Sequence, residues 1–219
     1  MLIDTSDLIA RATRGLSAAP SAAIFDPRTG RSWGRSDFDL NPDLVADLAR
    51  MDAPKPAAVL IPIVKRDELT VLLTERSLQL AKHSGQISFP GGKIDAADAS
   101  PLAAALRETH EEIGLAPALV TPLGYLDTYR TGTGYSVTPV VALVEPGFEL
   151  TVNAGEVADV FEVPLAFLMN PGNHKRATRE WRGIQRAFYA VHYQERYIWG
   201  ATAGMIVNLH ERLFGNVGN

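Results

Sequence analysis

One capped segment with clustered carboxylates limits the folds open to this chain more than any other feature. The Ser100 side chain can cap a helix N-terminus, and Pro101 suits the first helical position because it has no amide hydrogen to leave unpaired. Gly114 tolerates the left-handed conformation in which helices commonly end. The sequence therefore predicts a helix over residues 101–113. Three glutamates fall within it: Glu108, Glu111 and Glu112.

These glutamates share one arc of the predicted helix at about 100° per residue, and Leu102, Leu106 and Ile113 share a roughly opposite arc. We therefore expect one face to pack and the other to be acidic. Like charges at these spacings each cost a helix about 0.2–0.5 kcal/mol. A divalent cation would remove that conflict, because Mg²⁺ and Mn²⁺ take oxygen ligands. A solvated acidic face is the alternative.

Two glycines and an arginine favour the metal site. Gly91 and Gly92 follow an apolar stretch and let the backbone approach a ligand closely, so a carbonyl there could join the metal shell. Arg107 lies next to the acidic arc and could brace a carboxylate through a bidentate contact. The pattern predicts a site for Mg²⁺ or Mn²⁺ with these ligands: Glu108, Glu111, Glu112 and the Gly92 carbonyl.

Residues 92–115 resemble the Nudix hydrolase signature GX5EX7REUXEEXGU, in which U is an aliphatic residue, and the REXXEEXG core is intact. Asp98 stands where the signature has glutamate, eight residues rather than seven separate it from Arg107, and Thr109 replaces an aliphatic residue. The resemblance implies an α/β fold, the Nudix α/β/α sandwich around a mixed β-sheet. It also implies metal-dependent hydrolysis of a pyrophosphate bond.

Residues 72–92 are similar to the LLTXR(S/A)X3RX3GX3FPGG segment of coenzyme A diphosphatases within the Nudix family. They contain LLTERS, a glycine at the matching place, and FPGG. Ala81 occupies the place of the second arginine, with Lys82 beside it. The resemblance implies cleavage of coenzyme A or acyl-CoA into 3′,5′-ADP and 4′-phosphopantetheine or its acyl derivative. Arg76 and Lys82 are the implied substrate contacts.

Two later segments could contribute to the site. The loop at 130–135 is small and cationic, which makes Arg130 a candidate substrate contact, and a plain hairpin turn is an equally good interpretation. Glu156 lies in a segment that looks like one in coenzyme A diphosphatases, and Nudix enzymes often take an extra carboxylate from a distant loop; a solvent-facing glutamate is the alternative. Glu111 and Glu156 are both candidate general bases. We favour Glu156 as the base and Glu111 as a metal ligand.

Residues 1–54 are expected to form an N-terminal helical extension and residues 55–219 the Nudix domain. Within the extension, helices are expected at 5–16 and 42–51, and the proline-rich stretch after them breaks the chain. The domain is expected to contain further strands and a C-terminal helix, at 57–64, 69–74, 120–129, 136–144, 186–193, 197–200 and 202–214.

Composition excludes several classes of function. The chain has 219 residues, of which 46% are hydrophobic and 21% charged, as in ordinary soluble domains. A net charge of −4 disfavours a nucleic-acid partner, and the absence of cysteine excludes disulfides and thiolate sites. Early acidic residues and the lack of a long apolar run predict a cytoplasmic protein that does not span a membrane. A small-molecule nucleotide is the expected partner, and a homodimer is possible.

Other functions fit the same residues. A Nudix hydrolase of ADP-ribose, a dinucleotide or a nucleoside triphosphate is the nearest, since one fold and metal site can serve many substrates. A module that senses a nucleotide without hydrolysing it comes next, and the intact REXXEE core disfavours it. A scaffold protein would leave the glutamates as a solvated surface.

Overall fold

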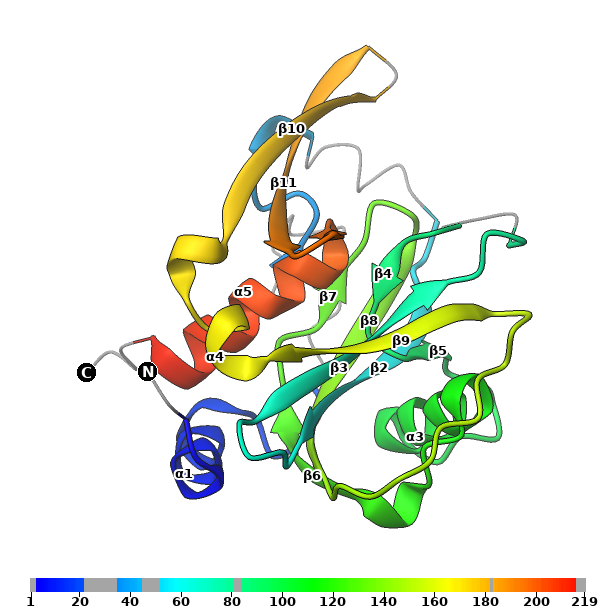
Figure 1. Ribbon diagram of the computed structural model, residues 1–219. Coiled ribbons are helices and arrows are strands. Elements are labelled where there is room, and N and C mark those ends of the chain that lie inside the picture. The colour runs from blue at the N-terminus through cyan, green and yellow to red at the C-terminus, as the bar shows by residue number, and fades with distance from the viewer. Residues whose placement is uncertain (1–2, 22–34, 45–51, 81–83, 182, 216–219) are drawn as a thin grey trace.

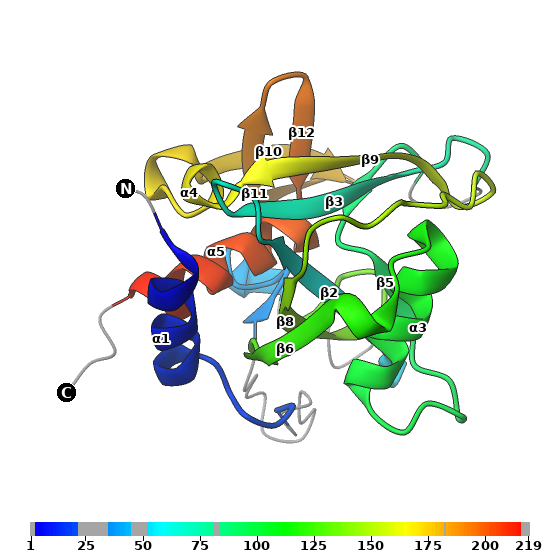
Figure 2. The same cartoon turned by 60° about the horizontal axis from the view of Figure 1, so that its bottom comes forward.

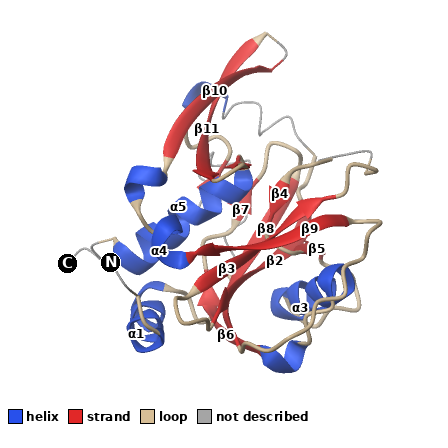
Figure 3. Cartoon of the chain, in the orientation of Figure 1, coloured by secondary structure: helices blue, strands red, loops and turns tan. Residues whose placement is uncertain are grey.

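The computed structural model describes residues 3–21, 35–44, 52–80, 84–181 and 183–215. In these residues a mixed nine-stranded sheet lies between helices on its two faces (Figures 1 and 3). Its strands are β1 (Arg35–Ser36), β2 (Lys55–Val64), β3 (Thr70–Arg76), β4 (Ile87–Ser88), β5 (Gly91–Lys93), β6 (Val120–Tyr125), β7 (Tyr129–Arg130), β8 (Tyr135–Val144) and β9 (Val157–Pro164).

The remaining elements are helices and a smaller antiparallel sheet. The α-helices are α1 (Thr5–Gly15), α3 (Pro101–Ile113), α4 (Leu165–Leu168) and α5 (Ala201–Phe214). Three short 3₁₀ helices are η1 (Pro42–Leu44), η2 (Pro117–Leu119) and η3 (Pro171–Asn173). The three-stranded sheet contains β10 (Lys175–Trp181), β11 (Ile184–Tyr193) and β12 (Arg196–Trp199). Among the described residues, no helix is long and apolar enough to cross a membrane.

Alternating side chains on the central strands build two cores, one on each face of the large sheet. On β2, Ile61 and Ile63 belong to the core that also contains residues of α1 and α5. Leu60 and Val64 point to the opposite core, which contains residues of α3. Helices α1 and α5 lie side by side on one face, and α3 covers the other (Figure 2). This architecture confirms the predicted α/β/α sandwich.

The pairing of β2 decides where the glycine-rich strand lies. Strand β2 runs parallel to β8 along its whole length, and it pairs with β3 only at Ile63 and Val64. Its other half pairs with β5, so that Gly91 lies opposite Val59 and Gly92 opposite Ala58. The two glycines are therefore fixed in the sheet, on a strand that α3 contacts.

The N-terminal region contacts the same body. Leu8 and Ala12 of α1 are buried in the core shared with α5, and β1 pairs with β7. The predicted helix at 5–16 is confirmed as α1. Residues 42–44 form η1, and the rest of the helix predicted there lies outside the described residues. The division of the chain at residues 54 and 55 stays a prediction.

The β10–β11 hairpin projects from the body at the top of Figure 1. The predicted strand at 186–193 corresponds to β11, and β10 was not predicted. The Asn41 side chain binds β11 as a neighbouring strand would: its amide donates to the Ala187 carbonyl at 2.8 Å, and its oxygen accepts from the Ala187 amide at 2.8 Å.

Candidate active site

Helix α3 begins and ends where its sequence predicts. The Ser100 hydroxyl accepts a hydrogen bond from the Ala103 amide at 3.1 Å. Gly114 has φ 74°, in the left-handed region, and its amide donates to the His110 carbonyl at 2.8 Å. These local caps fix the ends of the helix and therefore which residues of α3 can face the sheet.

The predicted separation of α3 into an apolar face that packs and an acidic face holds for the apolar arc, which contacts the core, but it is wrong for Glu112. The buried residues of α3 include Thr109 and Glu112 together with two alanines and Ile113, whereas Leu102 and Leu106 are only partly buried. Glu112 is 3% exposed. Small alanines and the glycines of β5 let this side of the helix come close to the sheet, so one carboxylate of the acidic arc becomes enclosed. A fully solvated acidic surface is therefore excluded for Glu112.

The Glu112 carboxylate contacts both segments that precede α3 in the sequence. One oxygen, Oε2, accepts a hydrogen bond from the Gly91 amide at 3.0 Å. The other, Oε1, lies 3.9 Å from Arg76 Nη1. Burial raises the pKa of Glu112 to about 7; the Gly91 amide and Arg76 oppose the rise, and the charges of Glu156 and Glu108 add to it.

Glu108 lies against Gly92. A Cβ atom on Gly92 would come within 2.3 Å of Glu108 Oε2, so a glycine is required for this carboxylate to keep its place. Burial raises the pKa of Glu108, and its hydrogen bond with Arg107 counteracts part of that rise. The glycine thus leaves space for an acidic side chain at the sheet surface.

Arg107 forms hydrogen bonds with three of the acidic residues in and before α3. Its Nε and Nη2 bind Asp98 Oδ1 and Oδ2 at 3.0 and 2.8 Å, the bidentate geometry that suits a guanidinium and a carboxylate. Its Nη1 binds Glu108 at 3.0 Å and Glu111 at 3.1 Å. The hydrogen bond from Arg107 lowers the pKa of Asp98. Asp98 therefore orients Arg107, despite the longer spacing between the two residues.

Glu111 and Glu156 differ in their surroundings. The Glu111 side chain is 54% exposed and lies 3.1 Å from Arg107 Nη1. Glu156 is partly buried; its side chain accepts from Asn153 Nδ2 at 3.1 Å, and its carbonyl accepts from the Ser77 amide at 2.8 Å. Burial is the main cause of the raised pKa of Glu108 and of Glu112, and the charge of Glu156 adds to both.

The arginines predicted to bind substrate lie on different strands of the large sheet. Arg76 lies at the end of β3, beside Glu112, and its Nε is buried with no partner among the described residues. Arg130 was expected in a loop, but it lies in β7 and is 6% exposed. Its Nη2 donates to the Asp52 carbonyl at 3.4 Å, and within the described residues its Nε and Nη1 have no partner. Lys82 lies outside the described residues.

The carboxylates and Gly92 form a donor set of the kind that hard cations use, in a cradle that a side chain at position 92 would fill. In this conformation no three acidic or histidine side chains of the described ranges converge as metal ligands do. Arg107 engages two of the candidate ligands, Glu108 and Glu111. The residue types fit a divalent cation, and its binding requires that Arg107 release Glu108 and Glu111.

Sequence reasoning missed Asn153, which orients Glu156. Asn153 also accepts a hydrogen bond from the Gly155 amide through its side-chain oxygen, at 3.1 Å. The Asn-Ala-Gly order is typical of such a side-chain turn and could have indicated that the following glutamate is held in place.

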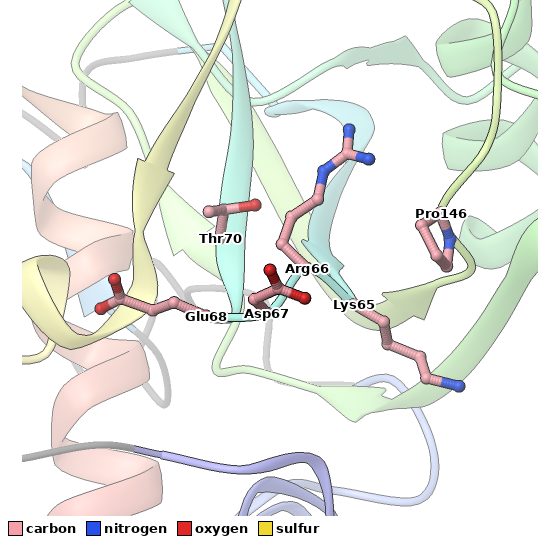
Figure 4. A pocket seen from close by; sticks show the side chains of 6 residues that line it. All are labelled: Lys65, Arg66, Asp67, Glu68, Thr70 and Pro146. Atoms are coloured by element: carbon pink, nitrogen blue, oxygen red, sulfur yellow. The ribbon is translucent and has the colours of Figure 1, made fainter.

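A shallow depression lies at the other end of β2. Its lining is shown in Figure 4 and consists of Lys65, Arg66, Asp67, Glu68, Thr70 and Pro146. From Ala58, beside Gly92, to Lys65 the strand rises on the order of 20 Å, so this depression is separate from the glutamates of α3. Arg66 is paired there with Glu162 at 2.6 Å. The described surface at this end offers no acidic metal site.

Comparison with known proteins identifies the family. The NUDIX domain model matches residues 54–182. The chain is 43% identical over 155 residues to the uncharacterized Nudix hydrolase NudL of Escherichia coli strain K12, covering 71% of this chain and 81% of that protein. The protein of the same name from Shigella boydii serotype 18 matches with the same identity and coverage.

Solved structures of similar proteins include an Ap4A hydrolase binary complex from C. elegans, with 22% identity, a TM-score of 0.44, and coverage of 50% of this chain and 80% of that one. A MutT/nudix family protein from Enterococcus faecalis has 17% identity and a TM-score of 0.47, covering 81% of this chain and 69% of that one. The family match extends over more than half of the chain and includes Gly91, Gly92 and every glutamate of α3. The chain belongs to the Nudix hydrolase family.

Proposed function

We propose that this Nudix hydrolase cleaves the pyrophosphate bond of coenzyme A or acyl-CoA, releasing 3′,5′-ADP and 4′-phosphopantetheine or its acyl derivative. The surroundings of Glu112 carry the proposal. This carboxylate belongs to the REXXEE core, accepts a hydrogen bond from Gly91 of the FPGG segment and lies 3.9 Å from Arg76 of the LLTERS segment. The two segments that resemble the coenzyme A diphosphatases thus meet the Nudix core at one buried group.

A divalent cation, Mg²⁺ or Mn²⁺, is part of the proposal. Its ligands would be Glu108, Glu112, Glu111 and the Gly92 carbonyl. When bound, the cation would neutralise charge on the pyrophosphate and lower the pKa of a bound water. The enclosure of Glu112 among acidic neighbours supports this assignment, because burial first, and then the charges of Glu156 and Glu108, raise its pKa. Binding would replace the contacts of Arg107 with Glu108 and Glu111.

Glu156 is proposed as the general base, with Glu111 as the alternative. The oxygen of a water molecule bonds to one phosphorus, the bond from that phosphorus to the bridging oxygen breaks, and the proton of the water passes to Glu156. The hydrogen bond from Asn153 holds the acceptor in place. Glu111 is more exposed, and its carboxylate already contacts Arg107 at 3.1 Å, so it is the second choice.

Arg76, Arg130 and Lys82 are proposed to bind the substrate. A buried guanidinium without a counter-charge is unfavourable, and an anionic oxygen of the substrate would satisfy it. Arg130 meets this description among the described residues, because its Nε and Nη1 have no partner and burial lowers its pKa. Arg76 likewise has an unpartnered Nε.

A substrate panel tests the function. The protein is incubated with Mg²⁺ or Mn²⁺ and coenzyme A, acetyl-CoA, ADP-ribose, a dinucleoside polyphosphate or a nucleoside triphosphate, and the products are separated by chromatography. Release of 3′,5′-ADP from the coenzyme A substrates supports the proposal. Cleavage of ADP-ribose or the dinucleotide without cleavage of coenzyme A would reassign the substrate. No turnover of any diphosphate would favour a nucleotide sensor.

A further inference from the structure

We propose that Arg196 is a positioning residue for the active site, an inference that rests on the proposed function. Arg196 begins β12, beyond the part of the chain that the family model matches. Its guanidinium reaches the large sheet and makes ion pairs with Glu75 of β3 and Asp159 of β9. Each of these carboxylates lies close in sequence to a proposed site residue, Arg76 in one case and Glu156 in the other.

The two carboxylates need a cation between them. Glu75 and Asp159 are directly opposite each other in the antiparallel register of β3 and β9, and like charges in that position destabilise a sheet. Arg196 uses a different nitrogen for each, Nη1 for Glu75 and Nη2 for Asp159. The guanidinium also lies 4.5 Å from the centre of the Phe161 ring, which fixes its plane.

The three residues Arg196, Glu75 and Asp159 are called the clamp below. The clamp lies where the register of β3 and β9 changes. Glu75 pairs with Asp159, whereas Arg76 pairs with Val157, so Ala158 is an extra residue on β9. Such a bulge re-aims the side chains that follow it. Because neighbouring side chains point to opposite faces, a Glu75 held toward β12 directs Arg76 toward α3, where it meets Glu112.

Next to the bulge, the residue that follows β3 is hydrogen-bonded to the proposed base. The Ser77 amide donates to the Glu156 carbonyl at 2.8 Å, one residue past Arg76. The position of Glu156 therefore depends on how β3 and β9 come together at the clamp. We infer that Arg196 sets the positions of Arg76 and Glu156 through Glu75 and Asp159, without touching substrate itself.

A second contact from the same region supports the clamp. The buried Thr202 hydroxyl at the start of α5 donates to the Ile87 carbonyl at 3.0 Å, and Ile87 of β4 is the partner of Glu75 on the other side of β3. The C-terminal region thus holds β3 at Glu75 from two directions. Its role is to keep the end of this strand in one arrangement.

Arg66 provides a matched control. It makes a bidentate ion pair with Glu162 of β9, and its guanidinium lies 5.2 Å from the centre of the Phe148 ring. Arg66 thus also combines an ion pair to β9 with a ring contact, but it binds one carboxylate rather than bridging two, and it lies beside the depression in Figure 4. Arg66→Met removes a comparable ion pair and ring contact without affecting the bulge.

The experiment compares Arg196→Met with Arg66→Met in the full chain. Steady-state kinetics with Mg²⁺ use whichever diphosphate the parent cleaves, and amide hydrogen exchange is followed at Ser77. A displacement of about 1 Å at catalytic groups can reduce a rate about 100-fold, so we expect kcat of Arg196→Met to fall roughly 10- to 100-fold. We also expect KM to rise and Ser77 to exchange faster, while Arg66→Met stays within about twofold of the parent.

The inference is overturned if the two variants match in kcat, KM and Ser77 exchange. If Arg196→Met does not fold, Arg196→Lys is used to test the inference. A single ammonium group lacks the planar geometry that binds both carboxylates, so kcat is expected to lie several-fold below that of the parent. A parental kcat in Arg196→Lys overturns the inference. If the parent cleaves no diphosphate, the proposed function fails on its own. Ser77 exchange in the two methionine variants then decides the role of Arg196.

Discussion

Glu112 on α3 accepts a hydrogen bond from the backbone amide of Gly91 on β5, across the interface between helix and sheet. The contact exists because β5 pairs with β2 at the point where α3 covers it, and because Gly91 has no side chain. A Cβ on Gly91 would lie 2.4 Å from the Ala58 carbonyl oxygen, and its φ of 145° is one that other residues rarely adopt. The acidic helix and the glycine-rich strand therefore form one site.

Glu112→Gln tests whether this carboxylate is a metal ligand. The amide keeps the shape of the side chain and an oxygen that can accept from Gly91, but it removes the charge. Loss of several kcal/mol of charge stabilisation corresponds to a decrease in kcat of about 100-fold or more, with the fold retained. Steady-state kinetics and circular dichroism measure both effects. Glu145→Gln, an exposed partner of Lys65, is the control, and parental turnover in Glu112→Gln would exclude the ligand role.

The pKa of Glu112 predicts how the stability of the metal-free protein depends on pH. Burial raises this pKa from the ordinary 4.5 to about 7, so between these values the folded state holds a proton that the unfolded state has released. The unfolded state then binds fewer protons at this residue, so the contribution of Glu112 to the free energy of unfolding decreases as pH rises from 4.5 to 7, by roughly 3 kcal/mol at most.

The measurement is urea unfolding in EDTA at pH 5 and pH 8, for the parent and for Glu112→Gln. Other groups titrate in both proteins, so the difference between the two isolates Glu112. The parent is expected to lose more stability than the variant on going to pH 8, and an equal loss would show that Glu112 has an ordinary pKa. Because cation binding favours the carboxylate, added Mn²⁺ should stabilise the parent most at the higher pH.

Gly92→Ala tests the space beside Glu108. The added Cβ would lie 2.3 Å from the Glu108 carboxylate, which is the far end of a flexible side chain and can turn aside. We therefore expect a small change in melting temperature and a decrease in kcat of about tenfold or more, since ligand geometry must be kept within about half an ångström. Gly172→Ala is the control, because the atoms nearest to its added Cβ belong to the side chain of Asn170, the residue that caps η3.

If Gly92→Ala melts far below the parent, the substitution has disturbed β5 itself. A parental kcat in a stable Gly92→Ala protein would show that Glu108 does not have to occupy its present position. The melting temperature and kcat are therefore measured on the same preparation.

Local chemistry is what the sequence predicts best in this protein. The ends of α3 follow from Ser100, Pro101 and Gly114, each of which acts on its own neighbours. The β2–β3 hairpin follows from two apolar runs and a polar turn. The carboxylates that belong to one motif were predicted together for the same reason.

Contacts between distant segments could not be predicted in this way. The burial of Glu112 depends on β5 pairing with β2, which the pattern of α3 does not contain. Strand β10 has charged residues at most positions, and its partner β11 is held by Asn41 from 146 residues away. Arg196 lies 121 residues from Glu75 in sequence. A single sequence gives no signal for such pairs.

Arg130→Met separates substrate binding from stability. Arg130 is buried and, among the described residues, its side chain makes a single hydrogen bond, a 3.4 Å contact with the Asp52 carbonyl, so its charge lacks a counter-ion there. Replacing a buried, poorly paired charge by an apolar side chain of similar length is often neutral or stabilising by about 1–4 kcal/mol. If Arg130 binds an anionic group of the substrate, the same change should raise KM about tenfold or more, because a charge-assisted hydrogen bond contributes about 1.5–3 kcal/mol.

The expected result is thus an equal or higher melting temperature together with a higher KM and a nearly unchanged kcat. Thermal melting and steady-state kinetics on the substrate that the parent cleaves best provide both values, with Arg66→Met as the control for loss of an arginine elsewhere on the sheet. A higher melting temperature with an unchanged KM would remove Arg130 from the binding site. A large loss of stability would instead mean that the guanidinium is structurally required. Its positive charge would then have to be compensated by other groups in the folded protein.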